Sequence, residues 1–174
     1  MIKLLIFCLF LTSVLSKEYK AVENLNLDNY IGEWYQVYED NFDKTFQGNG
    51  KCAKAYYGMN SNNITVLNTQ INNNGDLENI TGFAYYKDED YGGYLTVKLE
   101  DNPEAPYWVI ELGPIVDNYY DYSIVSDNIK LSLFVLTRNV SRYYELYDEK
   151  VLLSLDNFGF KSFINKPLKM EQNC

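Results

Sequence analysis

The fold of this chain is decided by one stretch, Asn29-Tyr30-Ile31-Gly32-Glu33-Trp34-Tyr35-Gln36-Val37-Tyr38. It reads as a β-strand that opens on a glycine, with Gly32 two residues before Trp34. Glycine lets the backbone approach a neighbouring segment closely, and tryptophan brings a large aromatic plate to the same place. The stretch therefore indicates a strand that crosses one end of a barrel, although a lone Gly-x-Trp also fits an ordinary core tryptophan.

The chain has 174 residues, which suits one domain with a sizeable core. After a short basic start, the apolar run Leu4–Leu11 leads to the small-residue positions Val14 and Ser16. This pattern is typical of a secretory signal peptide and is too short for a membrane span. We expect residues 1–16 to be a signal peptide and residues 17–174 to form a single secreted, extracellular domain.

Charge and composition exclude several classes of function. The chain is acidic, with a net charge of −9, and has no basic cluster, so we expect no binding of nucleic acid. It has no histidine, which removes Ser-His-Asp and Cys-His catalysis and His-ligated zinc. The acidic runs Asp88-Glu89-Asp90 and Glu100-Asp101 lack calcium-loop spacing and are typical of solvated turns. We expect no enzyme activity, no catalytic residues, no metal and no cofactor.

Two cysteines, Cys52 and Cys174, remain in the mature chain, because Cys8 lies in the expected signal peptide. An even pair in an oxidising compartment favours a disulfide. It would close a loop of more than a hundred residues, for which chain entropy predicts at most about 4–5 kcal/mol of stabilisation. The sequence also predicts a glycoprotein, because three Asn-x-Ser/Thr sequons are glycan candidates. They begin at Asn63, Asn79 and Asn139.

The order of elements favours an all-β fold followed by a helix. Short β-rich runs, separated by Gly, Asn and Asp clusters, suit antiparallel meanders. The runs are 33–39, 51–59, 64–71, 79–86, 93–100, 107–112, 119–126 and 130–138. Eight strands close an up-and-down barrel wide enough for one small ligand. The polar link Asp40 to Gly50 is a candidate lid over its open end. Apolar residues then recur at helical spacing between Arg142 and Leu155, with Ser141 as N-cap and a stop at Asn157 to Gly159.

With this order, three motifs resemble those of the lipocalin family, and more closely its apolipoprotein D and bacterial-lipocalin branch. The first is the opening stretch. The second is Asp121-Tyr122-Ser123-Ile124-Val125, and the third is Phe134-Val135-Leu136-Thr137-Arg138-Asn139. The resemblance runs over nearly the whole mature chain. It implies a calyx, an eight-stranded antiparallel up-and-down β-barrel with one C-terminal helix packed outside. It also implies the Cys52–Cys174 disulfide, whereas the second disulfide of the branch has no cysteines here.

The resemblance separates structural residues from ligand-binding residues. Arg138 is expected to lie across the Trp34 ring at the closed end, a contact of about 0.5–2 kcal/mol that leaves the barrel open only at the far end. Gly32, Asp121 and Tyr122 complete this structural motif. If Arg138 faces inward, strand alternation also turns Leu136 and Phe134 inward. The other inward positions that the resemblance implies are Tyr57, Asn68, Leu99 and Tyr107. Plain core packing remains an alternative for each of these six.

The leading hypothesis is a secreted, monomeric carrier of a small hydrophobic ligand. A fatty acid, a lysolipid, a retinoid or a sterol-like molecule would each suit a mostly apolar cavity with few polar anchors. One alternative is an interaction or signalling module that binds a receptor through its open-end loops, where Phe42 and Phe46 could touch a membrane surface transiently. Another alternative is a lipocalin-type isomerase, which is disfavoured because both mature cysteines are needed for the disulfide.

Overall fold

The structure is a computed structural model that describes residues 18–60, 63–86 and 92–174, without the side chains of residues 45–47. The expected signal peptide, the acidic run 88–90 and the side chain of Phe46 lie outside the described residues. The three sequon asparagines are all exposed, and their glycosylation stays a prediction.

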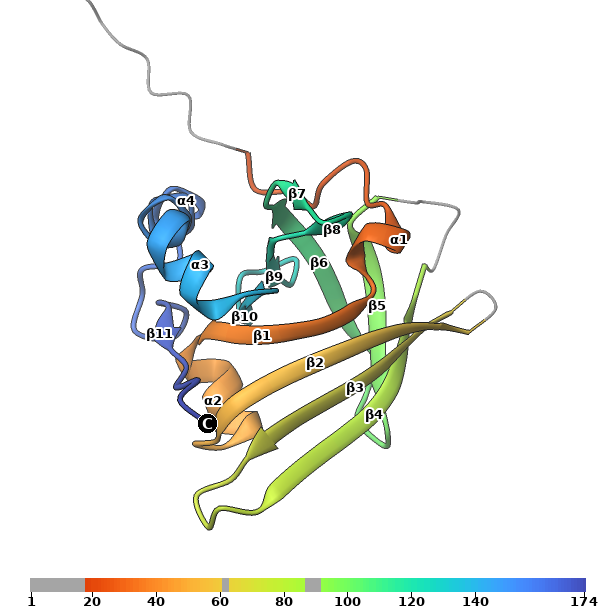
Figure 1. The fold of residues 1–174 in the computed structure, drawn as a ribbon, viewed down its shortest axis with the longest axis vertical. Coiled ribbons are helices and arrows are strands. Elements are labelled where there is room, and N and C mark those ends of the chain that lie inside the picture. Colours follow the sequence, from red (N-terminus) through yellow and green to blue (C-terminus); the bar gives the residue numbers. More distant parts are fainter. Residues whose placement is uncertain (1–17, 61–62, 87–91) are drawn as a thin grey trace, which may run out of the picture.

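Eight antiparallel strands close into a barrel (Figure 1). Each strand pairs with the next, and β10 returns to β1. The strands are β1 (Gly32–Glu39), β2 (Lys51–Asn60), β3 (Asn63–Ile71), β4 (Leu77–Tyr85), β5 (Tyr94–Leu99), β6 (Ala105–Leu112), β9 (Tyr122–Ser126) and β10 (Leu133–Thr137). A small ladder of β7 (Ile115–Val116) and β8 (Tyr119–Tyr120) lies between β6 and β9 in the chain. The predicted all-β, up-and-down barrel is confirmed.

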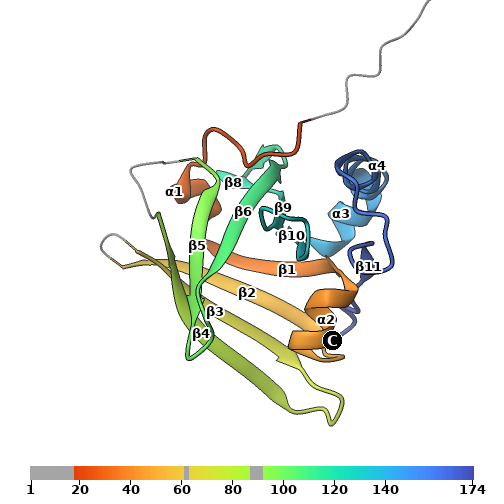
Figure 2. The ribbon, with the colours of Figure 1, turned by 180° about the vertical axis from the view of Figure 1, so that it is seen from behind.

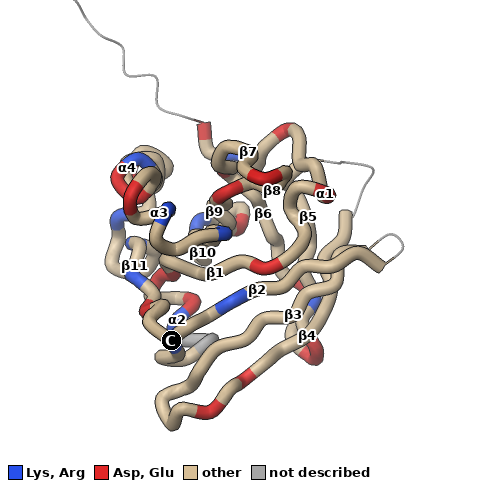
Figure 3. The backbone as a smooth tube through the Cα atoms, in the orientation of Figure 1, with Lys and Arg blue, Asp and Glu red and all other residues tan. Residues whose placement is uncertain are grey.

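The helices lie at the two ends and on the outside of the barrel. Helices α1 (Leu27–Tyr30) and α2 (Asn41–Gln47) flank β1, one at each of its ends (Figure 1). Seen from behind, α3 (Val140–Leu146) and α4 (Asp148–Phe158) lie outside the barrel wall (Figure 2). Charged residues gather in the loops and helices, and few lie on the strands (Figure 3).

The single helix expected between Arg142 and Leu155 is divided into two helices, α3 and α4. Its N-cap is Asn139, whose side chain accepts a hydrogen bond from the backbone N–H of Arg142. Ser141, the expected cap, lies inside α3. Tyr147 adopts φ −124° and ψ −23°, which divides the segment into α3 and α4. The predicted stop is right, because Gly159 ends α4 in the left-handed conformation that glycine tolerates.

Two apolar cores share the barrel wall. One fills the inside and includes Trp34, Tyr57 and Val109. The other lies between the outer face of the wall and α4, and includes Tyr122 and Leu155. Because successive side chains of a strand point to opposite faces, each strand supplies the inner core and the outer core in turn. The helix therefore packs outside and leaves the inside to the strands.

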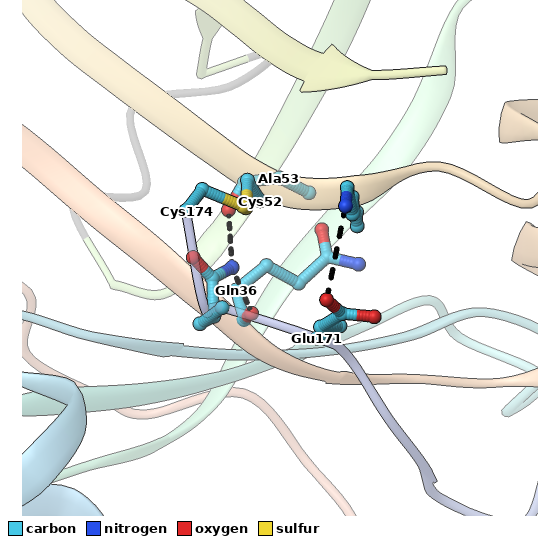
Figure 4. Close-up of a disulfide and its surroundings, with 7 residues drawn as sticks. Gln36, Cys52, Ala53, Glu171 and Cys174 are labelled. Atoms are coloured by element: carbon cyan, nitrogen blue, oxygen red, sulfur yellow. Dashed lines mark hydrogen bonds and ion pairs between the residues drawn. A yellow bond between two sulfur atoms is a disulfide. The ribbon is translucent and has the colours of Figure 1, made fainter. Parts of the chain in front are cut away.

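The predicted disulfide between Cys52 and Cys174 is confirmed. It fixes the end of the C-terminal tail to β2 (Figure 4). The short strand β11 (Leu168–Lys169) of the same tail pairs with β1. In addition, the Gln172 side-chain amide donates to the carbonyls of Gln36 and Ala53 at 2.7 and 2.8 Å. The tail thus joins two strands where their own pairing has stopped.

Candidate ligand site inside the barrel

The closed end of the barrel is built around Arg138. Its guanidinium lies 3.7 Å from the centre of the Trp34 ring. It donates to the carbonyls of Glu33, Tyr30 and Ile31 at 2.5, 2.8 and 2.8 Å. Burial lowers the pKa of Arg138 to about 10, so the side chain stays charged at neutral pH. The cation therefore satisfies backbone carbonyls where α1 ends and β1 begins, next to Trp34, which is fully buried.

The other structural-motif residues, Gly32, Asp121 and Tyr122, support the closed end and the outer face of the wall. Gly32 has a φ of +100°, and a Cβ there would meet the Arg138 side chain at 3.2 Å. Asp121 is 1% exposed and accepts two hydrogen bonds from Arg142, at 2.7 and 2.5 Å. Tyr122 belongs to the outer core. These residues hold the closed end and the helix in place.

The register of the sheet turns all six sequence-predicted lining residues to the inside. Tyr57 and Leu136 are buried in the inner core, and Leu99, Tyr107 and Phe134 are partly exposed and pack against it. Asn68 pairs with Ala55, which pairs in turn with Trp34, so the three side chains share the inner face. The structure therefore brings the six onto one lining.

Most of this lining is apolar or small. Other inward positions of the strands include Gln36, Ala53, Ala55, Ile64, Val66, Ile80, Gly82, Ala84, Leu95, Val97, Val109, Leu112, Ser123 and Val125, and the hydrogen-bonded pair Gln70 and Glu78 on β3 and β4. Among these positions, all within the described residues, Glu78 alone carries a charge, and it is exposed. Such a surface suits a neutral, largely apolar molecule.

Four hydroxyl groups form a chain at the closed end of this lining, here called the hydroxyl chain. Tyr107 donates to Tyr57 at 2.9 Å, Tyr30 and Tyr107 are joined at 2.8 Å, and Tyr30 and Ser123 at 3.2 Å. Burial raises the pKa of Tyr30 to about 12 and moves the pKa of Tyr57 and Tyr107 upward as well. All three phenols are therefore neutral at physiological pH.

Sequence reasoning missed Tyr30, Ser123 and Gln36 as members of the lining. Tyr30 was visible only as a motif position, and its hydroxyl meets a residue 77 positions away. Two amide atoms on the lining, Gln36 Nε2 and Asn68 Oδ1, are buried and have no hydrogen-bond partner among the described residues. Alternation along β1, starting from Trp34, could have identified Gln36.

The expected lid segment from Asp40 to Gly50 contains α2, which the sequence reading did not predict. Asp40 caps this helix by accepting from the backbone N–H of Asp43 at 2.9 Å. The Asp43 carboxylate in turn accepts from the backbone N–H of Leu133 at 2.7 Å, which ties the helix to β10. Outside α2, a polar pocket of about 580 Å³ runs toward the turn 72–75 and the tail residues 169–171.

Residues 25–161 match the family model described as a lipocalin-like domain. The chain belongs to the lipocalin family. Members of this family in general bind small hydrophobic ligands and are not enzymes. In the described part of this lipocalin, no helix is long and apolar enough to cross a membrane.

Three relatives are similar to this lipocalin in sequence. The Lazarillo protein of Schistocerca americana is 32% identical over 113 residues, which cover 63% of this chain and 50% of the relative. Apolipoprotein D of Oryctolagus cuniculus is 31% identical, covering 59% of this chain and 51% of the relative. The outer membrane lipoprotein Blc of Vibrio cholerae is 29% identical, with 81% and 80% covered. The chain thus spans about half the length of the first two relatives.

Solved structures show the same fold. Insecticyanin of the tobacco hornworm Manduca sexta superposes with a TM-score of 0.65 at 16% identity, covering 89% of this chain and 85% of that chain. Lobster apocrustacyanin A1 gives a TM-score of 0.62 at 21% identity, covering 86% and 81%. At such identities the likeness concerns the barrel and its outer helix alone.

Proposed function

We propose that this lipocalin is a secreted, monomeric protein that holds one small hydrophobic molecule in its barrel and carries or sequesters it. The observation that carries the proposal is the largely apolar inner lining, on which Leu99, Tyr107 and Phe134 remain partly exposed next to a closed end sealed by Trp34 and Arg138. Large apolar side chains that keep accessible surface inside a barrel gain about 25 cal/mol per Å² when a ligand covers them.

The ligand class is a fatty acid, lysolipid, retinoid or sterol-like molecule. We assign its contacts to Tyr57, Asn68, Leu99, Tyr107, Phe134 and Leu136. The leader pattern and the disulfide support secretion, because disulfides persist in oxidising compartments. An isomerase role is not favoured, since the two mature cysteines are bonded to each other and neither can act as a nucleophile.

A titration with a neutral fluorescent probe, N-phenyl-1-naphthylamine, tests this function. We expect saturable one-to-one binding, and a loss of at least about tenfold in affinity in Leu99→Trp, because the larger ring fills the interior. The matched control is Leu67→Trp, on the outer face of β3 and 38% exposed, which should bind as the native chain does. Absence of saturable binding, or equal loss in both variants when both remain folded, contradicts the proposal.

A further inference from the structure

The direction of every hydrogen bond in the hydroxyl chain follows from counting protons. A neutral phenol has one proton, and Tyr107 gives its proton to Tyr57. Tyr107 can then only accept from Tyr30, so Tyr30 is the donor in their 2.8 Å contact. The proton of Tyr30 is thereby used, and Ser123 must donate to Tyr30. The chain runs from Ser123 through Tyr30 and Tyr107 to Tyr57.

Tyr57 is the end of this chain, and its own proton has no acceptor among the residues that the structure describes. Successive hydrogen bonds polarise one another, so a hydroxyl that accepts from such a chain becomes a better donor. Tyr57 is 6% exposed, which makes an unused donor there costly. The inner face of the closed end therefore presents one strong, unmatched O–H group.

The lining contains two more unmatched polar atoms closer to the mouth. Asn68 lies two residues along β3 from Val66, the pairing partner of Tyr57, and thus about 7 Å further from the closed end. Its Oδ1 is without a partner, as is Nε2 of Gln36, a side chain that is 6% exposed. Buried polar atoms are nearly always paired in folded proteins. Because both atoms lie on the same inner lining as Tyr57, toward the mouth, they indicate a site built for a partner that is not part of the chain.

The charges around this site favour a neutral partner over an anionic one. The Arg138 cation acts electrostatically on the pKa of both Tyr30 and Tyr57. Its guanidinium, however, already donates to three backbone carbonyls and packs on the Trp34 ring. A carboxylate placed at Tyr57 would lose its hydration without gaining an ion pair, which is costly. A carbonyl or ether oxygen needs only the one donor that Tyr57 offers.

We propose that Tyr57 is the anchor for a neutral oxygen acceptor, such as a ketone, carried at the leading end of the ligand. The inference rests on the proposed function, because it specifies which end of the hydrophobic molecule enters first. A molecule with such an oxygen goes in oxygen first, and its apolar body covers Leu99 and Phe134. A fatty acid, in contrast, goes in tail first and keeps its carboxylate at the mouth.

Three probes of equal chain length test this anchor, namely 2-dodecanone, dodecane and dodecanoate, each displacing N-phenyl-1-naphthylamine. The variant Tyr57→Phe removes one hydroxyl and keeps the ring. We expect it to weaken 2-dodecanone binding about three- to tenfold, the range for one neutral hydrogen bond, and to leave dodecane and dodecanoate unchanged. The matched control is Tyr56→Phe, because Tyr56 is the neighbouring tyrosine on the outer face and is 55% exposed.

A second measurement does not depend on affinity. The infrared carbonyl stretch of bound, ¹³C-labelled 2-dodecanone should lie at lower frequency than in hydrocarbon solvent, and should return to the hydrocarbon value in Tyr57→Phe. An unshifted carbonyl in the native protein would overturn the anchor. So would equal losses for ketone, hydrocarbon and dodecanoate in a folded Tyr57→Phe variant.

The two proposals fail in different ways. If the fluorescent probe and all three chains fail to bind the native protein, the proposed function itself is wrong. If the probe and dodecane bind, but the ketone gains nothing from the Tyr57 hydroxyl, the barrel is a hydrophobic carrier without this anchor. In that case water molecules satisfy the end of the hydroxyl chain.

Discussion

The two ends of the barrel bury charge in opposite ways. At the closed end, the cation Arg138 donates to several backbone carbonyls and packs on Trp34, so its charge is well compensated. At the open end, Glu39, Asp40 and Asp43 are each at most 5% exposed. One oxygen of Glu39 and one of Asp40 have no partner among the described residues. The charge at the closed end is thus independent of pH near neutrality, whereas the buried acids at the open end change their charge with pH.

The pKa values follow this contrast. Burial raises the pKa of Glu39 to about 7, against a smaller opposing effect of Lys44. The pKa of Asp40 and that of Asp43 are also raised, chiefly by burial, and Asp127 on the facing β9–β10 turn adds to both. These three acids are here called the rim carboxyls; Asp40 caps α2, and Asp43 ties α2 to β10. Their protonation state therefore bears on how firmly α2 is held against β10.

The largest effect is expected at the closed end. Arg138→Met should lower the free energy of unfolding by about 3 kcal/mol, because it leaves buried carbonyls unpaired and removes the contact on Trp34. Urea unfolding at pH 5.5 and pH 8 measures it. The loss should be the same at both values, since the pKa of Arg138 is about 10. Lys150→Met, an exposed change on α4, is the control, and a loss no larger than the control would break the comparison.

The second effect concerns pH and the rim carboxyls. A carboxyl whose pKa is higher in the folded than in the unfolded chain binds more protons when folded, so stability falls as pH rises between the two values. Each such group contributes about 1 kcal/mol per pH unit within that window. For Glu39 the window runs from its ordinary value of 4.5 to about 7. Unfolding measured from pH 4.5 to 8 should show this decline.

A substitution at Asp43 isolates the contribution of the rim. Asp43→Asn keeps an oxygen that can accept from Leu133 and removes the carboxyl whose pKa burial raises, so it should stabilise the protein at pH 8 and flatten the pH dependence. Asp101→Asn removes an equal charge from an exposed position and is the matched control. If both variants give the same pH profile, overall charge repulsion and not the rim accounts for the decline.

Much of the barrel could be predicted from the sequence because its rules are local. Alternation within each strand places Leu136 and Phe134 on one face, and a motif of neighbouring residues carries Gly32 and Trp34. The helix stop was also local, since Gly159 has the residue type that a left-handed cap needs. The helix start was misplaced because Asn139 and Ser141 are both good caps, and only the backbone decides which of them is used.

The parts that escaped prediction depend on contacts between distant residues. The hydroxyl chain joins Tyr30 to Tyr107 and Ser123, which lie 77 and 93 positions away, and no local pattern distinguishes these two tyrosines from the fifteen others. The rim carboxyls read as ordinary polar loop residues, because acids are usually exposed. Their burial follows from the packing of α2 against β10, which a single sequence does not reveal.

The smallest effect tests whether burial, and not charge alone, sets the two ends apart. Glu33 and Lys54 form an ion pair of 3.0 Å near the closed end, with side chains that are 48% and 38% exposed. Lys54→Met should therefore cost no more than about 0.5 kcal/mol at low salt, because solvent already stabilises both charges. The difference should vanish in 1 M NaCl, where the screening length is about 3 Å. A cost comparable to that of Arg138→Met would mean that any charge at the closed end is structural, and the contrast between buried cation and buried acids would lose its basis.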